Sequence, residues 1–448
     1  MRVHAIAAPA APGDAPVLDQ LAHAAAVHRA VDEIHAREPV DAVVAPLWGC
    51  EGIVCLLDGR FPTVVSCMTS ATTIEALRGR ARADPETKRL IALERATMRR
   101  ARYVHGLTRG ALDRTLSDHG ARPAEAAVVG RGLADRGGAA GPAASDPPAI
   151  VFLGRLERRK GVATLLEAAR RLVAAGLRFT LILAGPDSGD TETGEPYRAA
   201  FEREAGQDLA ARVRFAGAVP DAERDELLRT AAIVCVPSRY ESHGVVLVEA
   251  MMFGRPIVAC AAGGVAEVVE DGGNALLAEP DDPASLADAL ARLIADADLR
   301  ARLGARSRAL YQERFEVGRV AEAMEAFLRR VAGAHSAADL ALSEVGEGMA
   351  SVIREVVPEA GDGLAAELLE PPASAWSESV LAAERERVAW QARAAEAEHQ
   401  VGEWRARALE AERQRAAADA SLRAVAHSRW WRLTAPLRRA TAALRRRG

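Results

Sequence analysis

From residue 233 to residue 254 the chain reads Ile-Val-Cys-Val-Pro-Ser-Arg-Tyr-Glu-Ser-His-Gly-Val-Val-Leu-Val-Glu-Ala-Met-Met-Phe-Gly. The apolar run Ile233–Val236 predicts a buried strand, and Pro237 ends it. From about Val245 the apolar spacing becomes helical, and Gly254 provides a cap for the end of that helix. A buried strand that passes through a short loop into a helix is the repeating unit of an α/β sheet.

The same succession of strand, glycine and helix occurs elsewhere in this part of the chain. Further strands are predicted at Ala149–Gly154, Leu181–Gly185, Val213–Val219 and Pro256–Cys260. Five such units in one direction predict an α/β fold with a parallel, doubly wound sheet. In a sheet of this kind ligands bind at the carboxyl ends of the strands.

The loop between strand 233–236 and its helix carries residues suited to a nucleotide sugar. Glu241 follows the strand. His243, Gly244 and Val245 lie where the helix begins, so free backbone N–H groups and the positive end of the helix dipole face outward. Such a helix start suits phosphate, and Glu249, one turn later, can accept hydrogen bonds from sugar hydroxyls. The pattern predicts a nucleotide-sugar pocket; the alternative is an ordinary strand, loop and helix with two surface glutamates.

The spacing of Glu241 and Glu249 resembles the E-x7-E motif of retaining family 4 glycosyltransferases, which have the GT-B fold. The resemblance implies that Glu249 bonds the ribose of the donor nucleotide and that Glu241 lies by the transferred sugar. It also implies that the helix start at Gly244 and Val245 holds the diphosphate. The family usually has Phe at the position of His243.

A basic loop after strand 149–154 resembles the G-R-x4-K-G loop of the same family. In that family the Arg and the Lys, here Arg155 and Lys160, clamp the donor diphosphate. Cations are needed because negative charge grows on the leaving group as the glycosidic bond breaks, and they can supply what Mg²⁺ supplies elsewhere. The other interpretation is a solvated basic loop, a role that Arg158 and Arg159 already fill.

Other glycines complete the expected donor site. In the family, a pair such as Gly263 and Gly264 lets backbone N–H groups approach the donor, although a tight turn explains the pair equally well. Gly154 and Gly185 end strands near the phosphates by the same resemblance. Val219 ends the strand that lines the nucleobase slot, which does not identify the base.

We expect neither a metal site nor a cofactor beyond the nucleotide-sugar substrate. The Asp-x-Asp spacing at Asp296 and Asp298 lies in a polar stretch between two helical patterns and indicates a solvated surface. Five cysteines without metal-ligand spacing indicate reduced, buried residues of a cytoplasmic protein. A net charge of −4 argues against nucleic acid as a partner. The sequence has no convincing signal peptide and no apolar run long enough to span a bilayer.

The composition changes along the chain predict six parts. They are an acceptor-side Rossmann-like domain (1–145), a donor-binding Rossmann-like domain (146–318), a helix that returns to the first domain (319–335), a linker (336–377), a long helix or weak coiled coil (378–427) and a basic amphipathic tail (428–448). In the first domain we expect strands near 3–7, 41–45, 62–67, 103–107 and 126–129, and helices near 17–37 and 86–102.

The first domain departs from the family at several places. Its beginning resembles the middle of the family's N-terminal domain, so the first strand and a Gly-Gly loop are missing. The family's usual Val-Pro-Asn-Gly is replaced by Val-Val-Gly-Arg-Gly at residues 128–132. The His that often ends strand 63–66 is also missing, with Met68 nearest. We expect either an internal start or a reduced acceptor domain.

The C-terminal parts suggest contacts outside the active site. The 378–427 segment is rich in Ala, Glu, Arg and Gln, which suits self-association through a helix. The tail joins Trp430 and Trp431 to a short apolar helix face and many arginines, and resembles a segment of bacterial polysaccharide-associated transferases. It suits peripheral contact with the plasma membrane, or equally a protein contact or a disordered end.

We therefore predict a glycosyltransferase that moves a hexose from a nucleotide-diphosphate sugar to a glycan or lipid-linked acceptor with retention, in surface polysaccharide biosynthesis. Glu241, Arg155 and Lys160 are the catalytic candidates. One alternative is a non-catalytic GT-B-like scaffold in an assembly complex. Another is a GT-B sugar-nucleotide epimerase.

Overall fold

A computed structural model describes residues 16–78, 84–137, 146–190, 194–335, 342–358 and 364–369. The strand expected near 3–7, the long helix over 378–427 and the basic tail over 428–448 lie outside the described residues. Among the helices that the structure does describe, none has the length and apolar character needed to cross a bilayer.

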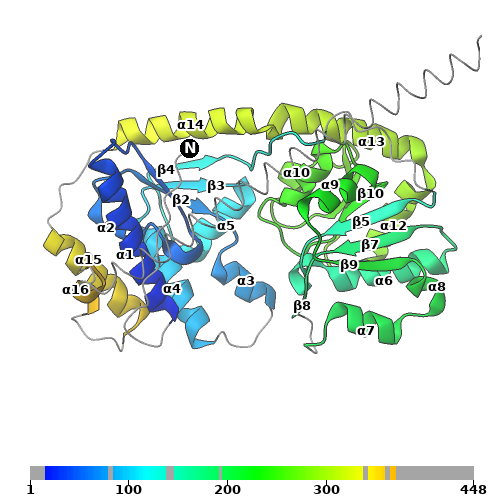
Figure 1. Cartoon of the computed structure of the whole chain (residues 1–448), viewed down its shortest axis with the longest axis horizontal. Coiled ribbons are helices and arrows are strands. Elements are labelled where there is room, and N and C mark those ends of the chain that lie inside the picture. The colour runs from blue at the N-terminus through cyan, green and yellow to red at the C-terminus, as the bar shows by residue number, and fades with distance from the viewer. Residues whose placement is uncertain are drawn as a thin grey trace, which may run out of the picture. The chain divides into compact units, whose positions relative to one another are not determined.

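The larger sheet has six parallel strands, in the order β12-β11-β10-β5-β7-β9 (Figure 1). Its strands are β5 (Ala149–Leu153), β7 (Thr180–Ala184), β9 (Val213–Gly217), β10 (Ile233–Val236), β11 (Ile257–Cys260) and β12 (Ala275–Ala278). The chain moves outward from β5 to β9 and then returns to place β10 on the other side of β5. This is the doubly wound order, and the change of direction between β5 and β10 opens a crevice where ligands bind.

Helices cover the six-stranded sheet on both faces because alternate strand residues point to opposite sides. Ile233 and Cys235 enter a core with α6 and α12, whereas Val234 and Val236 enter a second core with α9 and α10. The elements around the sheet are β6 (Leu156–Glu157), η2 (Arg158–Lys160), α6 (Val162–Ala174), β8 (Asp187–Asp190), α7 (Tyr197–Glu204), α8 (Gln207–Ala210), α9 (Asp221–Thr230), α10 (Val245–Met252), α11 (Val265–Val268), α12 (Pro283–Ala295), α13 (Ala297–Leu310) and η3 (Tyr311–Phe315).

A second, smaller sheet has four parallel strands in sequence order. The strands are β1 (Val43–Pro46), β2 (Thr63–Cys67), β3 (Tyr103–Gly106) and β4 (Glu125–Val128), and the helices are α1 (Pro16–His35), η1 (Trp48–Cys50), α2 (Ile53–Asp58), α3 (Ala71–Arg78), α4 (Pro85–Arg100) and α5 (Arg109–His119). These agree with the four later strands and two helices expected from the sequence. Asp84 explains where α4 begins, because its side chain accepts a hydrogen bond from Thr87 N at 2.9 Å.

The helix expected over 319–335 is α14 (Val317–Ala334), which follows η3 directly. Phe327 and Val331 on this helix form one buried cluster with Val64 and Tyr103 of the four-stranded sheet. The chain after the six-stranded sheet therefore returns to the first domain, because the apolar stripe of α14 is buried there.

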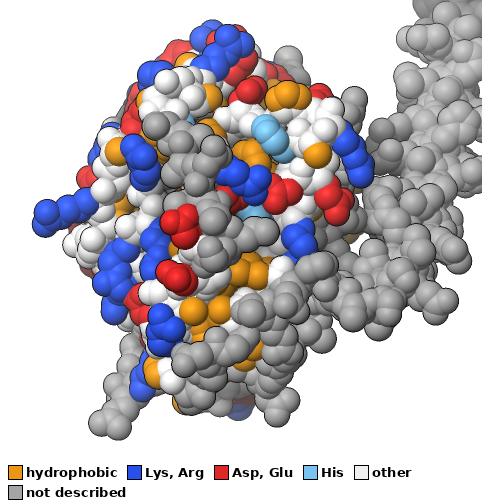
Figure 2. Space-filling view, turned by 90° about the vertical axis from the view of Figure 1, so that its left-hand side faces the viewer, with side chains coloured by type: hydrophobic (Ala, Val, Ile, Leu, Met, Phe, Trp, Pro, Cys, Tyr) orange, Lys and Arg blue, Asp and Glu red, His pale blue; other side chains and the backbone are white. Residues whose placement is uncertain are grey.

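The linker expected over 336–377 is wrong for most of its described residues. They form α15 (Leu342–Val356) and α16 (Leu364–Leu369). Val345, Met349 and Val352 of α15 are fully or almost fully buried, in the same core as α1, α2 and α4 (Figure 1). On the left-hand side of Figure 1, where these helices lie, Lys and Arg side chains are interspersed with Asp and Glu, so neither sign dominates the visible face (Figure 2).

Candidate functional site

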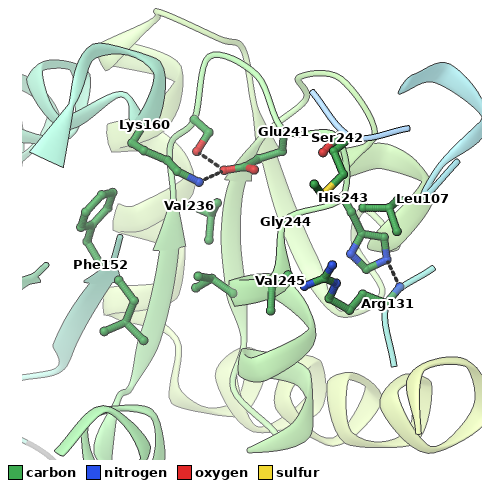
Figure 3. Close-up of a pocket in the computed structure, with 14 residues that line it drawn as sticks. Leu107, Arg131, Phe152, Lys160, Val236, Glu241, Ser242, His243, Gly244 and Val245 are labelled. Atoms are coloured by element: carbon green, nitrogen blue, oxygen red, sulfur yellow. Dashed lines mark hydrogen bonds and ion pairs between the residues drawn. The ribbon is translucent and has the colours of Figure 1, made fainter. Parts of the chain in front are cut away.

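A cavity of about 230 Å³ lies at the carboxyl ends of β5 and β10, the two strands between which the sheet changes direction (Figure 3). Its lining comes from both sheets: Met68, Leu107, Arg131, Phe152, Leu153, Lys160, Val236, Ser238, Glu241, Ser242, His243, Gly244, Val245 and Val246. Five residues that the sequence assigned to the donor site therefore line one cavity, namely Lys160, Glu241, His243, Gly244 and Val245.

The carboxylate of Glu241 is held inside this cavity by three neighbours. Lys160 Nζ lies 2.5 Å from Glu241 Oε1, and Ser238 Oγ donates a hydrogen bond to the same oxygen at 2.8 Å. Arg159 lies 3.9 Å from the other carboxylate oxygen. Glu241 is 6% exposed, so its charge is compensated by a nearby cation and hydroxyl rather than by bulk water. This arrangement fixes Glu241 before any ligand binds.

The helix α10 begins at the cavity wall. Gly244 precedes it with φ +77°, a conformation that favours glycine, and a Cβ there would lie 2.8 Å from Leu247 Cδ1. No side chain among the described residues caps this helix start. Leu247 N already donates a hydrogen bond to Gly244 O at 2.9 Å, so the N–H groups of Val245 and Val246 are the ones available to an anion, and the helix dipole adds to their attraction.

His243 is a neutral side chain at the same wall. Burial, together with the smaller effect of the positive charges of Arg131 and Arg314, lowers its pKa to about 4. Its Nε2 accepts a hydrogen bond from the Arg131 N–H at 3.2 Å, so the ring proton of the neutral form lies on Nδ1. Nδ1 is buried and has no partner among the described residues. Phe315 packs against the ring edge to face, with 5.7 Å between centroids.

Glu249 lies deeper in α10, outside the cavity lining. It is 3% exposed, and its carboxylate is paired with Arg224 of α9 and with Arg136, whose Nη2 lies 3.7 Å from Glu249 Oε1. Burial raises the pKa of Glu249, and the two arginines oppose that shift. The second glutamate of the motif is thus an acceptor already shared with two guanidinium groups.

Close backbone packing explains the glycine pair of the motif region. Gly264 N donates a hydrogen bond to Glu241 O at 2.7 Å, and a Cβ at Gly263 would lie 2.2 Å from the same oxygen. A Cβ at Gly264 would lie 2.3 Å from Thr108 Oγ1, which itself donates a hydrogen bond to Ser242 O at 2.7 Å. Both glycines therefore let their backbone approach the 241–242 segment and fix its position.

Residues 139–310 match the family model described as glycosyl transferases group 1. The match includes the six-stranded sheet, Lys160 and the segment from Glu241 to Glu249. This part of the chain is a glycosyl transferases group 1 domain.

Curated relatives of the group 1 domain are similar over part of their length. The D-inositol 3-phosphate glycosyltransferase of Corynebacterium efficiens is 38% identical over 157 residues, which are 35% of this chain and 36% of that protein. The alpha-D-kanosaminyltransferase of Streptomyces kanamyceticus is 28% identical over 187 residues, 42% of this chain and 46% of that protein. For the D-inositol 3-phosphate glycosyltransferase 1 of Catenulispora acidiphila the identity is 32% over 243 residues, 53% of this chain and 54% of that protein. The chain thus spans between a third and about half of these relatives.

Solved structures share the fold. The Anabaena HepE structure in complex with UDP has a TM-score of 0.52 and 22% identity, covering 68% of this chain and 82% of that chain. The sucrose-phosphate synthase of Thermosynechococcus elongatus has a TM-score of 0.57 and 22% identity, covering 69% of this chain and 78% of that chain. The GT-B architecture expected from the sequence is confirmed.

The remaining predicted residues of the group 1 domain surround the cavity without lining it. A Cβ at Gly154 would lie 3.9 Å from Lys160 Cε, and one at Gly185 would lie 1.9 Å from Gly154 O, so these strand ends are packed together. Arg155 is exposed and pairs with Glu157 at 3.2 Å, pointing its charge at a neighbour rather than into the cavity. Val219 is half-buried against the core beneath α9 and α10.

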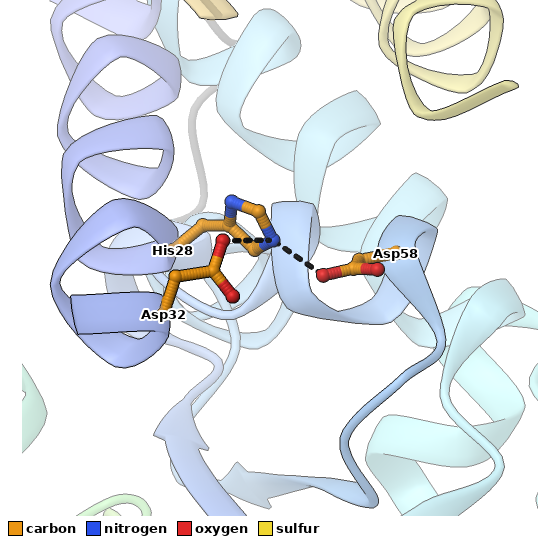
Figure 4. Close-up of side chains that lie close together, drawn as sticks. All are labelled: His28, Asp32 and Asp58. Carbon is orange, nitrogen blue, oxygen red and sulfur yellow. Dashed lines mark hydrogen bonds and ion pairs between the residues drawn. The ribbon is translucent and has the colours of Figure 1, made fainter. Parts of the chain in front are cut away.

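One cluster in the described residues, His28, Asp32 and Asp58, brings three metal-ligand atoms within reach of one another (Figure 4). His28 Nε2 lies 2.5 Å from Asp58 Oδ2. The guanidinium of Arg60 already occupies both carboxylates, at 2.7 Å from Asp32 Oδ1 and 2.7 Å from Asp58 Oδ1. A metal ion would have to displace this cation, so we interpret the cluster as a charge network that joins α1 to the end of α2.

Sequence reasoning missed several residues at the site. Ser238 holds Glu241, Arg224 and Arg136 hold Glu249, and Arg131 lines the cavity. The sequence does contain a feature that could have pointed to Arg131, because this residue lies in the segment that differs from the family's Val-Pro-Asn-Gly. No local sequence feature points to the two arginines at Glu249, because they lie 25 and 113 residues away in the sequence and only the fold brings them to this carboxylate.

Proposed function

We propose that this protein is a glycosyltransferase that moves a hexose from a nucleotide-diphosphate sugar to a hydroxyl group of a glycan or lipid-linked acceptor. The observation that carries the proposal is the cavity at the switch point of the group 1 domain. There an uncapped helix start, Lys160 and Glu241 surround one space. This combination suits a substrate with an anionic diphosphate and a hydroxyl-rich sugar.

The reaction exchanges one bond at the anomeric carbon of the sugar for another. The bond from that carbon to the diphosphate oxygen breaks, and its electron pair stays on the diphosphate. The acceptor oxygen forms the new bond, and its proton passes to the departing phosphate, which is our candidate base. Retention of configuration, which the family resemblance implies, requires the acceptor to enter on the face that the diphosphate leaves.

Each charged group has a role in this scheme. Lys160 and the first N–H groups of α10 stabilise the negative charge that grows on the diphosphate. Glu241, fixed by Ser238, accepts hydrogen bonds from sugar hydroxyls. Glu249 accepts hydrogen bonds from the ribose, which shares the carboxylate with Arg224 or replaces it. Arg155 approaches the diphosphate from the mouth of the site after it leaves Glu157.

The relatives support the reaction class, because the names of the Corynebacterium and Streptomyces proteins both describe transfer of a sugar. The HepE structure contains UDP, which makes UDP a reasonable first probe here. The acceptor belongs to surface polysaccharide biosynthesis, and the protein acts in the cytoplasm without metal or cofactor. The basic tail would bring it to the inner face of the membrane.

The chain offers a sharp binding test because it contains two lysines, Lys88 and Lys160. Reductive methylation with ¹³C-formaldehyde therefore labels these two side chains and the N-terminal amine. Titration of the full chain with UDP, GDP and ADP should shift the Lys160 methyl signal for one of them, while the signal of the exposed Lys88 stays unchanged. If the Lys160 methyl signal shifts with none of the three nucleoside diphosphates, the donor does not bind at this cavity.

Turnover is tested with the matching nucleotide sugars by release of the nucleoside diphosphate, with and without EDTA. We expect activity in EDTA, and a loss of more than about 10²-fold in kcat when Arg155 and Lys160 are both replaced by Ala. Lys88→Ala is the matched control and should retain full activity. Nucleotide binding without any turnover would favour the scaffold, and interconversion of the donor sugar without transfer would favour the epimerase.

A further inference from the structure

The cations around the cavity are not equivalent. The charge of Lys160 is compensated by Glu241 at 2.5 Å, and Arg159 pairs with Glu157 at 2.6 Å. Arg131 also lines the cavity, but among the residues that the structure describes no carboxylate forms an ion pair with its guanidinium. The cavity wall therefore carries one positive charge for which the protein itself supplies no counter-charge.

His243 presents a second unused group to the same space. Its Nε2 is taken by the Arg131 N–H, which leaves the Nδ1–H as a donor. The side chain is 1% exposed, and Nδ1 has no hydrogen-bond partner in the described residues. A buried donor without an acceptor is costly for a folded protein, so an acceptor supplied by a ligand would remove that cost.

These two groups lie together at the start of α10. Figure 3 shows the His243 ring and the Arg131 side chain beside Gly244 and Val245, at the end of the cavity away from the Lys160–Glu241 pair. A guanidinium, a ring N–H and the first N–H groups of a helix are all donors, and together they carry net positive charge. Glu241 is the carboxylate in the cavity lining, and Lys160 compensates it. The chemistry complementary to this end of the cavity is an oxyanion.

We propose that Arg131 and His243 form an oxyanion site that binds a phosphate of the nucleotide-diphosphate donor at the start of α10. The proposal rests on the proposed function and deepens it. Arg131 supplies the charge that the Lys160–Glu241 pair does not, and the His243 Nδ1–H supplies a directed hydrogen bond. As the bond to the sugar breaks, both groups stabilise the negative charge that the diphosphate gains.

The test compares variants by calorimetry with pyrophosphate, UDP and uridine as separate probes. Arg131→Gln should lower the affinity for UDP and for pyrophosphate by about tenfold or more, which is the effect of losing one charge-assisted hydrogen bond. The affinity for uridine, which has no phosphate, should stay unchanged. Arg131→Lys should restore part of the loss because it keeps the charge. Lys88→Gln, which removes an exposed cation of α4 outside the cavity lining, is the matched control and should leave UDP affinity unchanged.

A spectroscopic measurement separates ligand contact from a structural role of His243. In ¹⁵N-histidine-labelled protein, pyrophosphate should shift the Nδ1–H resonance of His243, and Arg131→Gln should reduce that shift at equal saturation. If the resonance does not respond to saturating pyrophosphate, His243 does not contact the oxyanion and the proposal fails. That readout needs no substitution at the buried histidine.

The outcomes also distinguish the sources of the oxyanion. Arg131→Gln could instead weaken the binding of glucuronic acid, or remove the extra affinity of UDP-glucuronate over UDP, and leave the affinity for UDP unchanged. In that case the site binds a sugar carboxylate and the phosphate assignment is wrong. If UDP binding is weakened by Lys160→Met and unaffected by Arg131→Gln, the inference is wrong while the proposed function stands. If no nucleoside diphosphate binds but pyrophosphate does, with a loss in Arg131→Gln, the oxyanion site is supported and the nucleotide donor is not.

Discussion

We expect the ion pair between Lys160 and Glu241 to contribute measurably to the free energy of unfolding of the protein without ligand. We consider three variants: Lys160→Met, Glu241→Gln and the double variant. Glu241 has its side chain 8% exposed and Lys160 18% exposed, and 2.5 Å separates their charged atoms. Breaking a buried pair by removing one partner is expensive because the other charge remains buried without compensation, typically about 3–5 kcal/mol.

The surroundings of the two side chains decide how much stability each variant loses. After Lys160→Met, Glu241 keeps the hydrogen bond from Ser238 at 2.8 Å and the more distant Arg159 at 3.9 Å. We therefore expect a loss of about 3 kcal/mol in the free energy of unfolding, at the low end. Glu241→Gln should cost less, about 1–2 kcal/mol, because the lysine is the more exposed partner and can reach water. The double variant should cost less than the sum of the two, by about 1–2 kcal/mol.

Urea unfolding of the full chain measures these free energies, and Lys88→Met is the matched control because Lys88 is exposed on α4. UDP calorimetry on the same samples adds the functional readout. Lys160→Met and the double variant should bind UDP more weakly because both lack the ammonium, whereas Glu241→Gln should bind UDP at least as tightly, because the diphosphate no longer competes with Glu241 for Lys160. Additive stability changes would show that the two side chains do not interact in solution, and would refute the reasoning. Full UDP affinity in Lys160→Met would remove the lysine from the donor site.

Three other predictions concern parts of the chain outside this pair. Burial would raise the pKa of Asp58, but hydrogen bonds from His28 and Arg60 outweigh it and lower the pKa from 3.8 to about 2. This carboxylate thus contributes about 2 kcal/mol to the free energy of unfolding above pH 4, and the contribution is lost as the pH falls through 2. In Asp58→Asn the urea midpoint should therefore depend less on pH below pH 4. Met349→Ala should lower the unfolding free energy by about 2–5 kcal/mol in the same assay, since Met349 is 0% exposed in α15, and an unchanged midpoint would contradict its packing. The full chain should sediment with anionic vesicles at low salt and be largely released at high salt, whereas a chain that ends at His427 should stay in the supernatant; equal behaviour would assign the tail to another role.

The sequence was sufficient to predict the core of the group 1 domain because the signals for its strands and helices are local. A buried β-strand such as Ile233–Val236 needs only its own apolar run, and the helix after it needs only a glycine and an apolar pattern. Parallel order then follows from the succession of strands and helices. The cavity residues from Glu241 to Val245 were predictable together for the same reason, since they are consecutive in the chain and lie at one strand end.

The helices α15 and α16 were missed although their pattern is present. Val345, Met349, Val352 and Val356 follow a helical spacing, and all four are buried. Gly346 and Gly348 disfavour a helix on propensity alone. The helix forms because its apolar stripe enters the core of the first domain, a tertiary contact between residues about 250 positions or more apart in sequence, which composition cannot reveal.

The partners of the site residues were missed for a related reason. Nothing in the local sequence shows that Glu249 meets Arg224, or that the Arg131 backbone holds His243. These contacts depend on how loops at several strand ends converge, and that geometry is set only when the sheets are formed. Residue types and spacing therefore predicted Glu241 and Glu249 as hydrogen-bond acceptors, while the structure was needed to show which cations each carboxylate already contacts.

The charges of the cavity side chains in the absence of a ligand connect the two proposals about the cavity. Because Lys160 and Glu241 neutralise each other and Ser238 orients the carboxylate, this pair adds no net charge that would attract a ligand. Attraction must then come from groups that lack an internal partner, and in the described part of the cavity lining these are Arg131, the His243 Nδ1–H and the start of α10. A diphosphate drawn to that end would reach Lys160 with its other phosphate and compete with Glu241 for the ammonium. Glu241 would then be free to accept hydrogen bonds from the sugar hydroxyls only when the diphosphate is in place. Binding of the diphosphate would therefore prepare Glu241 to bind the sugar.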